Sequence, residues 1–176
     1  MGSLAERIAN AFVANTLTQY IGCFIISMIP LIELRGAIPI AHWFKGMNPD
    51  NFNLVLGYVV IAIGNMLPVP FIFFFARKVL EWGKDKKFIG RFFTFCLEKG
   101  HKGGEKLQSK AGRGLFVALL LFVGIPLPGT GAWTGTLAAS ILDMKFKESV
   151  IAVMLGVALA GVIMGVLSAG IFGAIF

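Results

Sequence analysis

Long uncharged stretches alternate with short polar segments along this chain. The uncharged stretches run from Ile8 to Ile32, Leu54 to Phe75, Gly114 to Leu142 and Ser149 to Phe176. A hydrocarbon core of about 30 Å requires roughly 20 helical residues to cross it. The pattern therefore predicts an all-α integral membrane protein.

The stretch from Gly114 to Leu142 is interrupted near its centre by Pro126, Pro128, Gly129 and Gly131. As one helix it would reach about 43 Å, whereas each arm reaches only about 17 Å, half of the hydrocarbon core. We expect a re-entrant hairpin with its tip at 125–131. A full-length helix kinked at proline is the alternative, because transmembrane helices tolerate proline.

A similar interruption ends the first stretch, with a predicted tip at 30–39 between Pro30 and Pro39. A short apolar arm to Phe44 follows, and in the next polar turn Pro49 and Asp50 are expected to begin a helix. The stretch from Leu54 to Phe75 is long enough to span a membrane. It contains Asn65, Pro68 and Pro70, which predict a bend.

The order of hairpin and span occurs twice. Ile29-Pro30-Leu31 matches Ile125-Pro126-Leu127, and Gly36-Ala37 matches Gly131-Ala132. Because a single crossing separates the hairpins, they enter from opposite faces. The broken segments are then expected to meet near the midplane, as in transporters with inverted repeats. We predict one membrane domain, 1–176, with repeat 1 at 4–80, a cytoplasmic basic loop at 81–113 and repeat 2 at 114–176.

Composition and charge agree with a membrane protein. The chain is 57% hydrophobic and 14% charged, and soluble proteins average about 25% charged residues. Residues 77–113 carry eleven Lys and Arg against four Asp and Glu, which accounts for the whole net charge of +7. The positive-inside rule places this segment in the cytoplasm.

Within the basic segment, apolar residues recur at helical spacing. They are Trp82, Phe88, Ile89, Phe92, Phe93 and Cys96. This spacing predicts an amphipathic helix on the inner leaflet, with anionic membrane lipids as partners. A topology signal with a solvated face is the alternative.

Glu33 and Arg35 are the candidate functional residues of the first tip. A charge at the bilayer centre costs about 2.5 to 3.5 kcal/mol on insertion scales, so such residues usually face a cavity or a partner. Arg35 offers a bidentate fork for phosphate, and Glu33 can titrate and carry a proton. The alternative is that both reach an interface from a shallower hairpin.

The second tip can bind an anion through backbone N–H groups and a hydroxyl at Gly129, Thr130 and Gly131. Simple turn formation is the alternative. The predicted substrate site also includes conformationally special or polar residues near the two tips, namely Pro30, Gly36, Asn65 and Pro126. His42, next to Trp43, is expected at a membrane interface.

Other features narrow the function classes. Gly161, Gly165, Ala169 and Gly173 form a small-residue stripe that serves packing within the monomer or a homodimer. The chain contains no hydrolase motif, no metal-ligand cluster and no phosphate loop. We expect no catalytic residue, no metal, no cofactor and no nucleic-acid partner.

Two stretches, IPLIELRGAIPIA at 29–41 and GIPLPGTGAWTGTLAA at 124–139, resemble the bacterial family of small multidrug export proteins. That family is a distant relative of the DedA/VTT membrane proteins. The resemblance implies a multi-pass protein of the bacterial inner membrane, with Glu33 and Arg35 as the acid and arginine of the first hairpin. DedA proteins carry a further basic residue in the second hairpin, where this chain has only Gly129, Thr130 and Gly131.

Two functions remain. The first is a flippase or transporter for an anionic lipid carrier such as undecaprenyl phosphate, which the DedA relationship implies and Arg35 supports. The second is proton-coupled export of small cationic lipophilic drugs, for which Glu33 would be the shared acid. A non-transport scaffold is a third class, but paired broken hairpins serve no evident purpose in a scaffold.

Overall fold

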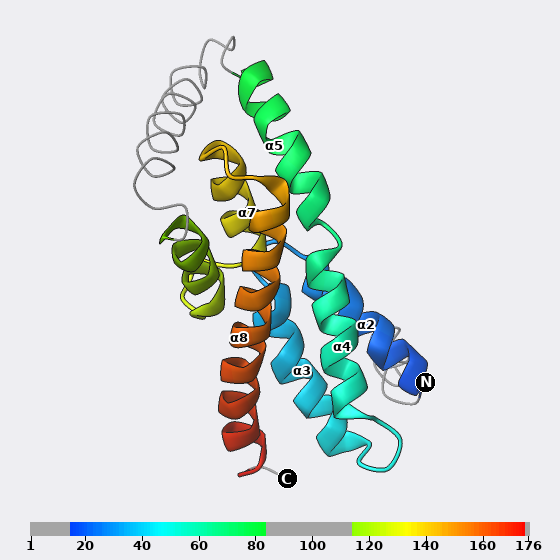
Figure 1. Ribbon diagram of the computed structural model, residues 1–176. Helices are drawn as coiled ribbons and strands as arrows, with labels where there is room; N and C mark the ends of the chain where they lie inside the picture. Colours follow the sequence, from blue (N-terminus) through cyan, green and yellow to red (C-terminus); the bar gives the residue numbers. More distant parts are fainter. Residues whose placement is uncertain (1–14, 84–113, 175–176) are drawn as a thin grey trace. The chain divides into compact units, whose positions relative to one another are not determined.

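The computed structural model describes residues 15–83 and 114–174, and within these ranges every regular element is a helix. The helices are α2 (Thr16–Met28), α3 (Glu33–Met47), α4 (Leu54–Met66), α5 (Val69–Gly83), the helix Gly114–Gly124, α7 (Ala132–Ile141) and α8 (Phe146–Phe172) (Figure 1). The predicted all-helical fold is confirmed. The predicted amphipathic helix and most of the basic loop lie outside the described residues.

The chain forms two compact units. Unit 1 comprises Met1–Leu67 and Ala158–Phe176, and unit 2 comprises Pro68–Val157. Unit 1 therefore holds α2, α3, α4 and the end of α8, whereas unit 2 holds α5, the helix Gly114–Gly124, α7 and the start of α8.

In unit 1, α2, α3 and α4 pack against one another. Short turns at 29–32 and 48–53 make each helix antiparallel to the next one in the chain. The prediction that Pro49 and Asp50 begin α4 is wrong. Asn53 caps the helix instead, because its side-chain oxygen accepts the N–H of Leu56 at 3.1 Å.

Close approach of α2 and α4 depends on Gly64. A Cβ atom at this position would lie 2.2 Å from Ser27 Oγ and 2.7 Å from the carbonyl oxygen of Phe24. Small residues permit such contact between helix backbones in membrane proteins. Gly64 therefore fixes the contact between α2 and the C-terminal end of α4.

We expect Gly64→Ala to destabilise the protein by about 1 to 3 kcal/mol, because the added methyl group collides with backbone as well as side-chain atoms. Gly170→Ala is the matched control, since a Cβ there meets nothing within 4 Å. Thermal unfolding of the purified variants in detergent measures the difference. Equal melting temperatures for the two variants would contradict the close approach.

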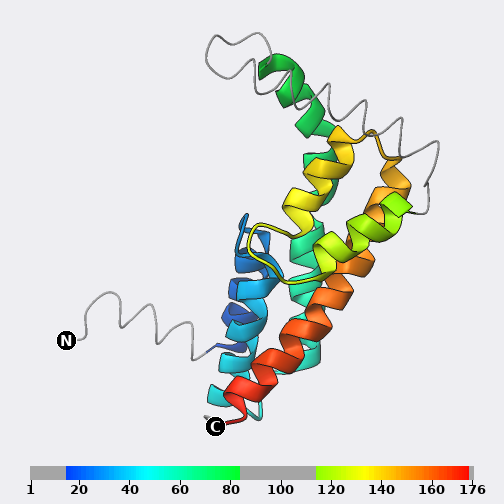
Figure 2. The ribbon, with the colours of Figure 1, turned by 90° about the vertical axis from the view of Figure 1, so that its left-hand side faces the viewer.

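In unit 2, α7 packs against α5, and the Ser140 hydroxyl donates to the carbonyl oxygen of Phe73 at 2.7 Å. Gly135 of α7 faces the helix Gly114–Gly124, where a Cβ would lie 2.5 Å from Val123. Figure 2 shows this helix and α7 joined by the non-helical segment between them.

The predicted interruption of the 114–142 stretch is present. The helix ends at Gly124, residues 125–131 are not helical, and α7 begins at Ala132. The two prolines of this segment lack an N–H group and disfavour helical geometry in the preceding residue, which explains the break. Re-entry of the hairpins and the inverted repeat stay predictions.

Two segments are long and apolar enough to cross a membrane. Leu54–Phe75 has 22 residues and mean hydropathy 2.0, and Phe146–Phe172 has 27 residues and mean hydropathy 2.7. The former is interrupted at Leu67 and Pro68, where the prolines predicted a bend. The arms Thr16–Met28 and Gly114–Gly124 reach only about 20 and 16 Å, too little to cross.

The small-residue stripe of α8 serves packing in unit 1. A Cβ atom at Gly161 would lie 4.0 Å from Ile38 of α3, and one at Gly165 would lie 2.6 Å from the hydroxyl of Tyr58 in α4. These two glycines thus contact helices of the same chain. A homodimer stays a prediction.

Candidate functional site

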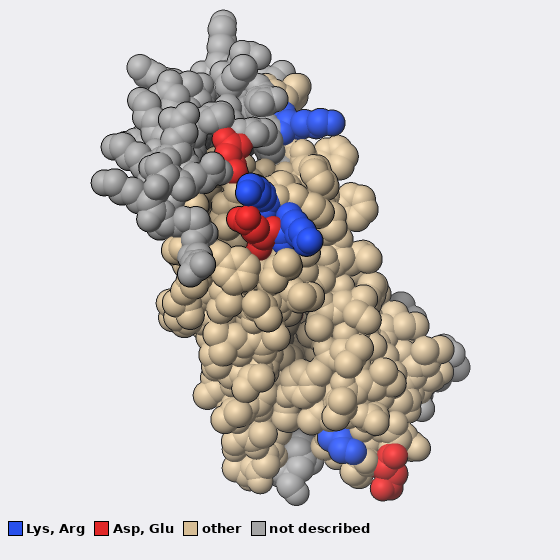
Figure 3. Space-filling model, in the orientation of Figure 1, with Lys and Arg blue, Asp and Glu red and all other residues tan. Residues whose placement is uncertain are grey.

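Charged side chains are few in unit 1. Its described residues include four, Glu33, Arg35, Lys45 and Asp50. Lys45 and Asp50 lie at the turn between α3 and α4, where Lys45 Nζ donates to the carbonyl oxygen of Pro49. Glu33 and Arg35 lie at the opposite end of α3, about 18 Å away along its axis. Figure 3 shows how little charged surface one face of the molecule carries.

Burial of Glu33 is the main feature of the first tip. Its side chain is 2% exposed, and among the described residues it is the one charged side chain that is buried. Apolar neighbours in the same turn face outward, with Leu31 76% and Ile32 43% exposed. A charge inside and apolar side chains outside reverse the order of a water-soluble protein and suit hydrocarbon surroundings.

The tip itself has an unusual backbone. Leu31 and Glu33 have positive φ angles of 71° and 51°, in the left-handed region that costs about 1 to 2 kcal/mol for a non-glycine residue. Side chains two residues apart in a regular helix point in different directions. Because the backbone of Glu33 is not helical, this separation does not apply to Glu33 and Arg35. Their charges interact, and Arg35 is half-buried.

The non-helical part of this tip is shorter than the predicted 30–39. Helix α3 already begins at Glu33 and contains both Gly36 and Pro39. Pro39 has no N–H to donate to the carbonyl oxygen of Arg35, but the helix continues through Pro39. Pro30 is exposed in the turn. Gly36 lies against Ile32, because a Cβ atom added at Gly36 would be 2.3 Å from Cγ2 of Ile32.

Asn65 of α4 lies at the level of Glu33. A Cβ atom at Gly57 would lie 3.8 Å from Cβ of Ala41, so these two positions are opposite each other in the antiparallel pair. Asn65 lies eight residues after Gly57 in α4, and Glu33 lies eight residues before Ala41 in α3. Eight helical residues rise about 12 Å, so Asn65 and Glu33 are at about the same height along the two helices. Asn65 is 0% exposed.

The amide of Asn65 makes no hydrogen bond within the part of the chain that the structure describes, through either Oδ1 or Nδ2. Ser27 of α2 is also 0% exposed and lies beside the neighbouring Gly64. Its hydroxyl donates to the carbonyl oxygen of Phe24 at 2.7 Å and can still accept. We call Ser27, Glu33, Arg35 and Asn65 the tip cluster.

The second tip lies in unit 2. Its backbone turns at Gly129 and Gly131, with φ angles of 81° and 147°. Thr130 donates its hydroxyl to the carbonyl oxygens of Ile125 and Leu127 at 3.0 and 2.9 Å, and its N–H to Leu127 at 3.2 Å. Both Thr130 donors therefore hold the turn, so the predicted anion contact falls on the backbone of the two glycines.

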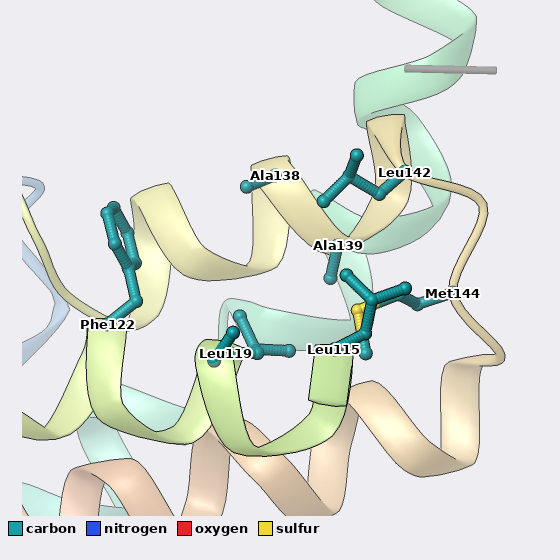
Figure 4. A pocket seen from close by; sticks show the side chains of 8 residues that line it. Leu115, Leu119, Phe122, Ala138, Ala139, Leu142 and Met144 are labelled. Atoms are coloured by element: carbon teal, nitrogen blue, oxygen red, sulfur yellow. The ribbon is translucent and has the colours of Figure 1, made fainter. Parts of the chain in front are cut away.

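An apolar cavity of about 180 Å³ lies between the helix Gly114–Gly124 and α7 in unit 2 (Figure 4). It is lined by Leu115, Ala118, Leu119, Phe122, Ala138, Ala139, Leu142 and Met144. A cavity of about 150 Å³ holds one benzene ring. Because no polar side chain lines it, the cavity can hold an apolar group but offers no side-chain hydrogen bond and no charge.

His42, expected at an interface, is half-buried in unit 1 and hydrogen-bonded to Tyr58 at 2.8 Å, with the ring of Phe172 stacked on it. This pair lies about 14 Å along α3 from Glu33. Among the described residues no group of three His, Cys, Asp or Glu side chains is placed to hold a metal ion.

Comparison with known proteins adds one finding to this geometry. The family model described as "Putative small multi-drug export protein" matches residues 33–163, about three quarters of the chain. The chain belongs to this family. Its match begins at Glu33 and includes Arg35, Asn65 and the second tip. No curated protein and no solved structure matches the chain.

Membership of a multidrug export family and two apolar helices of spanning length make this chain a membrane protein. The predicted family is confirmed, but its DedA relationship is not shown. Sequence reasoning singled out Glu33, Arg35 and Asn65 but missed Ser27. The signal for Ser27 was a lone hydroxyl in an apolar run, one turn before Pro30. The meeting of the two tips stays a prediction, since they belong to different units.

Proposed function

We propose that this small multidrug export family member is a multi-pass transporter of the bacterial inner membrane, and not an enzyme. It exports small lipophilic cations in exchange for protons. The observation that carries the proposal is Glu33, a carboxylate 2% exposed at the end of a helix hairpin that exposes large apolar side chains. The family description points in the same direction.

A buried carboxylate suits such an exchange, because burial opposes its charged form unless a counter-charge is present. A proton or a cationic substrate can supply that counter-charge, and the two compete for one acid. Arg35 supplies a permanent positive charge beside Glu33. Export then follows from alternate occupation of Glu33 by substrate and proton.

The test uses the full chain in vesicles of phosphatidylethanolamine and phosphatidylglycerol. An imposed pH gradient is expected to drive ethidium movement in vesicles that contain the protein and not in empty vesicles, and a protonophore is expected to abolish it. Equal dye movement in both kinds of vesicle would contradict the proposal.

A second candidate is transfer of an anionic lipid such as undecaprenyl phosphate between leaflets. The observation that favours it is Arg35, half-buried beside the tip, whose guanidinium can bind phosphate through two parallel hydrogen bonds. The predicted distant relationship to DedA proteins and the predicted inverted repeat would agree with this candidate. Membrane lipids would then be substrates as well as surroundings.

Multi-pass topology predicts that the two polar connections face opposite sides of the membrane. In single-cysteine variants that otherwise lack cysteine, we expect a cysteine at Asn48 to react from outside intact cells. One at Lys102 should react only after the membrane is opened, because the basic loop is cytoplasmic. A membrane-impermeant maleimide measures both. Labelling of both positions from the same side would refute the odd number of crossings between them.

A further inference from the structure

Among the described residues, Asn65 is the one side chain with two buried polar atoms that lack a hydrogen-bond partner. It is 0% exposed, and neither polar atom of its amide has a hydrogen-bond partner among the described residues. An amide buried in this way costs free energy that a polar ligand can recover. The position therefore calls for an occupant with hydrogen-bonding groups of its own.

The helix around Asn65 adds further hydrogen-bonding capacity. Pro68 and Pro70 have no N–H, so the carbonyl oxygens of Gly64 and Met66 cannot accept the bonds that a continuous helix would provide. Interrupted helices place such backbone groups at the binding sites of transporters. The end of α4 is thus polar within an otherwise apolar helix.

Counted by helix rise from Gly57 and Ala41, Asn65 and Glu33 are at about the same height along the antiparallel pair α3 and α4. An amide carries no charge, but it donates and accepts hydrogen bonds at the same time. It cannot replace Glu33 as a counter-charge for a cation. It can distinguish cations that carry a hydroxyl or amide group from cations that do not.

We infer that Asn65 binds a neutral hydrogen-bonding group, a hydroxyl or an amide, on the cation that Glu33 binds. This inference rests on the proposed export function and narrows its substrates to lipophilic cations with such a group. A site that hydrogen-bonds a substrate group discriminates against the analogue that lacks it. Asn65 is then a specificity-determining residue of the tip cluster.

The experiment compares two probes that differ by one group, tetraphenylphosphonium and its analogue with a hydroxyl on one phenyl ring. Their affinities for the purified full chain are measured by equilibrium dialysis. We expect the hydroxyl analogue to bind wild type about tenfold more tightly. In Asn65→Leu this preference should disappear while tetraphenylphosphonium binding remains. Asn51→Leu, in the exposed turn before α4, is the control and should keep the preference.

Equal affinities in wild type, or a preference that survives in Asn65→Leu, would overturn the inference. Thermal unfolding without ligand gives an independent result, because removal of an unsatisfied amide should raise the melting temperature of Asn65→Leu, and a lower one would count against it. If the leucine variant does not fold, Asn65→Ala is compared in the same binding assay. Loss of tetraphenylphosphonium binding in Glu33→Gln tests the export function separately, so the two failures are distinguishable.

Discussion

Glu33→Gln is expected to reduce proton-driven export of a lipophilic cation at least a hundredfold. Glutamine has nearly the same volume as glutamate, but it neither releases a proton nor carries the charge that a cation requires. Loss of one partner of a buried charge pair costs about 3 to 5 kcal/mol, which is more than a hundredfold in affinity. The measurement is the initial rate of ethidium movement in vesicles under an imposed pH gradient.

Asp50→Asn is the matched control for this substitution. Asp50 is the other acid among the described residues of unit 1 and is exposed in the turn between α3 and α4. We expect its variant to export at nearly the wild-type rate. Export that persists in Glu33→Gln, or that falls equally in both variants, would show that Glu33 has no special role.

Gly156→Leu is expected to prevent stable folding of unit 2. A Cβ atom at Gly156 would lie 2.7 Å from Cβ of Val123 and 2.8 Å from the carbonyl oxygen of Leu120. A leucine therefore forces α8 away from the helix Gly114–Gly124, and overpacking of this kind costs about 1 to 3 kcal/mol or more. We expect a large loss of monodisperse protein in detergent and a lower melting temperature.

Gly170→Leu is the control on the same helix, because a Cβ at Gly170 meets nothing within 4 Å. It should behave like the wild type in both measurements. A stable, monodisperse Gly156→Leu protein would show that α8 and the helix Gly114–Gly124 are not in close contact.

The breaks in the apolar stretches could be predicted from the sequence, because proline and glycine act through covalent geometry that does not depend on the rest of the fold. The segment 125–131 is non-helical as expected. The start of α3 could not be predicted, since Glu33 adopts a left-handed conformation that is unfavourable for a non-glycine residue. The start of α4 was misplaced because Pro49 and Asn53 both lie in the same polar turn.

The candidate site was predicted in part. Glu33 and Arg35 stand out in any reading of an apolar chain, and Asn65 stands out beside two prolines. Ser27 did not, because its position beside Gly64, the neighbour of Asn65 in the chain, is a property of three-dimensional packing. The hydroxyl of Thr130 was assigned to an anion, but its hydrogen bonds to Ile125 and Leu127 depend on the shape of the folded turn.

We propose that Glu33, and not Arg35, receives the charge of the substrate. Transport of ethidium and of labelled polyprenyl phosphate is measured in matched vesicles that contain wild type, Glu33→Gln or Arg35→Lys. We expect ethidium export to be lost in Glu33→Gln and largely kept in Arg35→Lys, since lysine retains the positive charge. Polyprenyl phosphate transfer by the wild type that is impaired in Arg35→Lys, together with unchanged ethidium movement in Glu33→Gln, would contradict the claim and favour the lipid carrier.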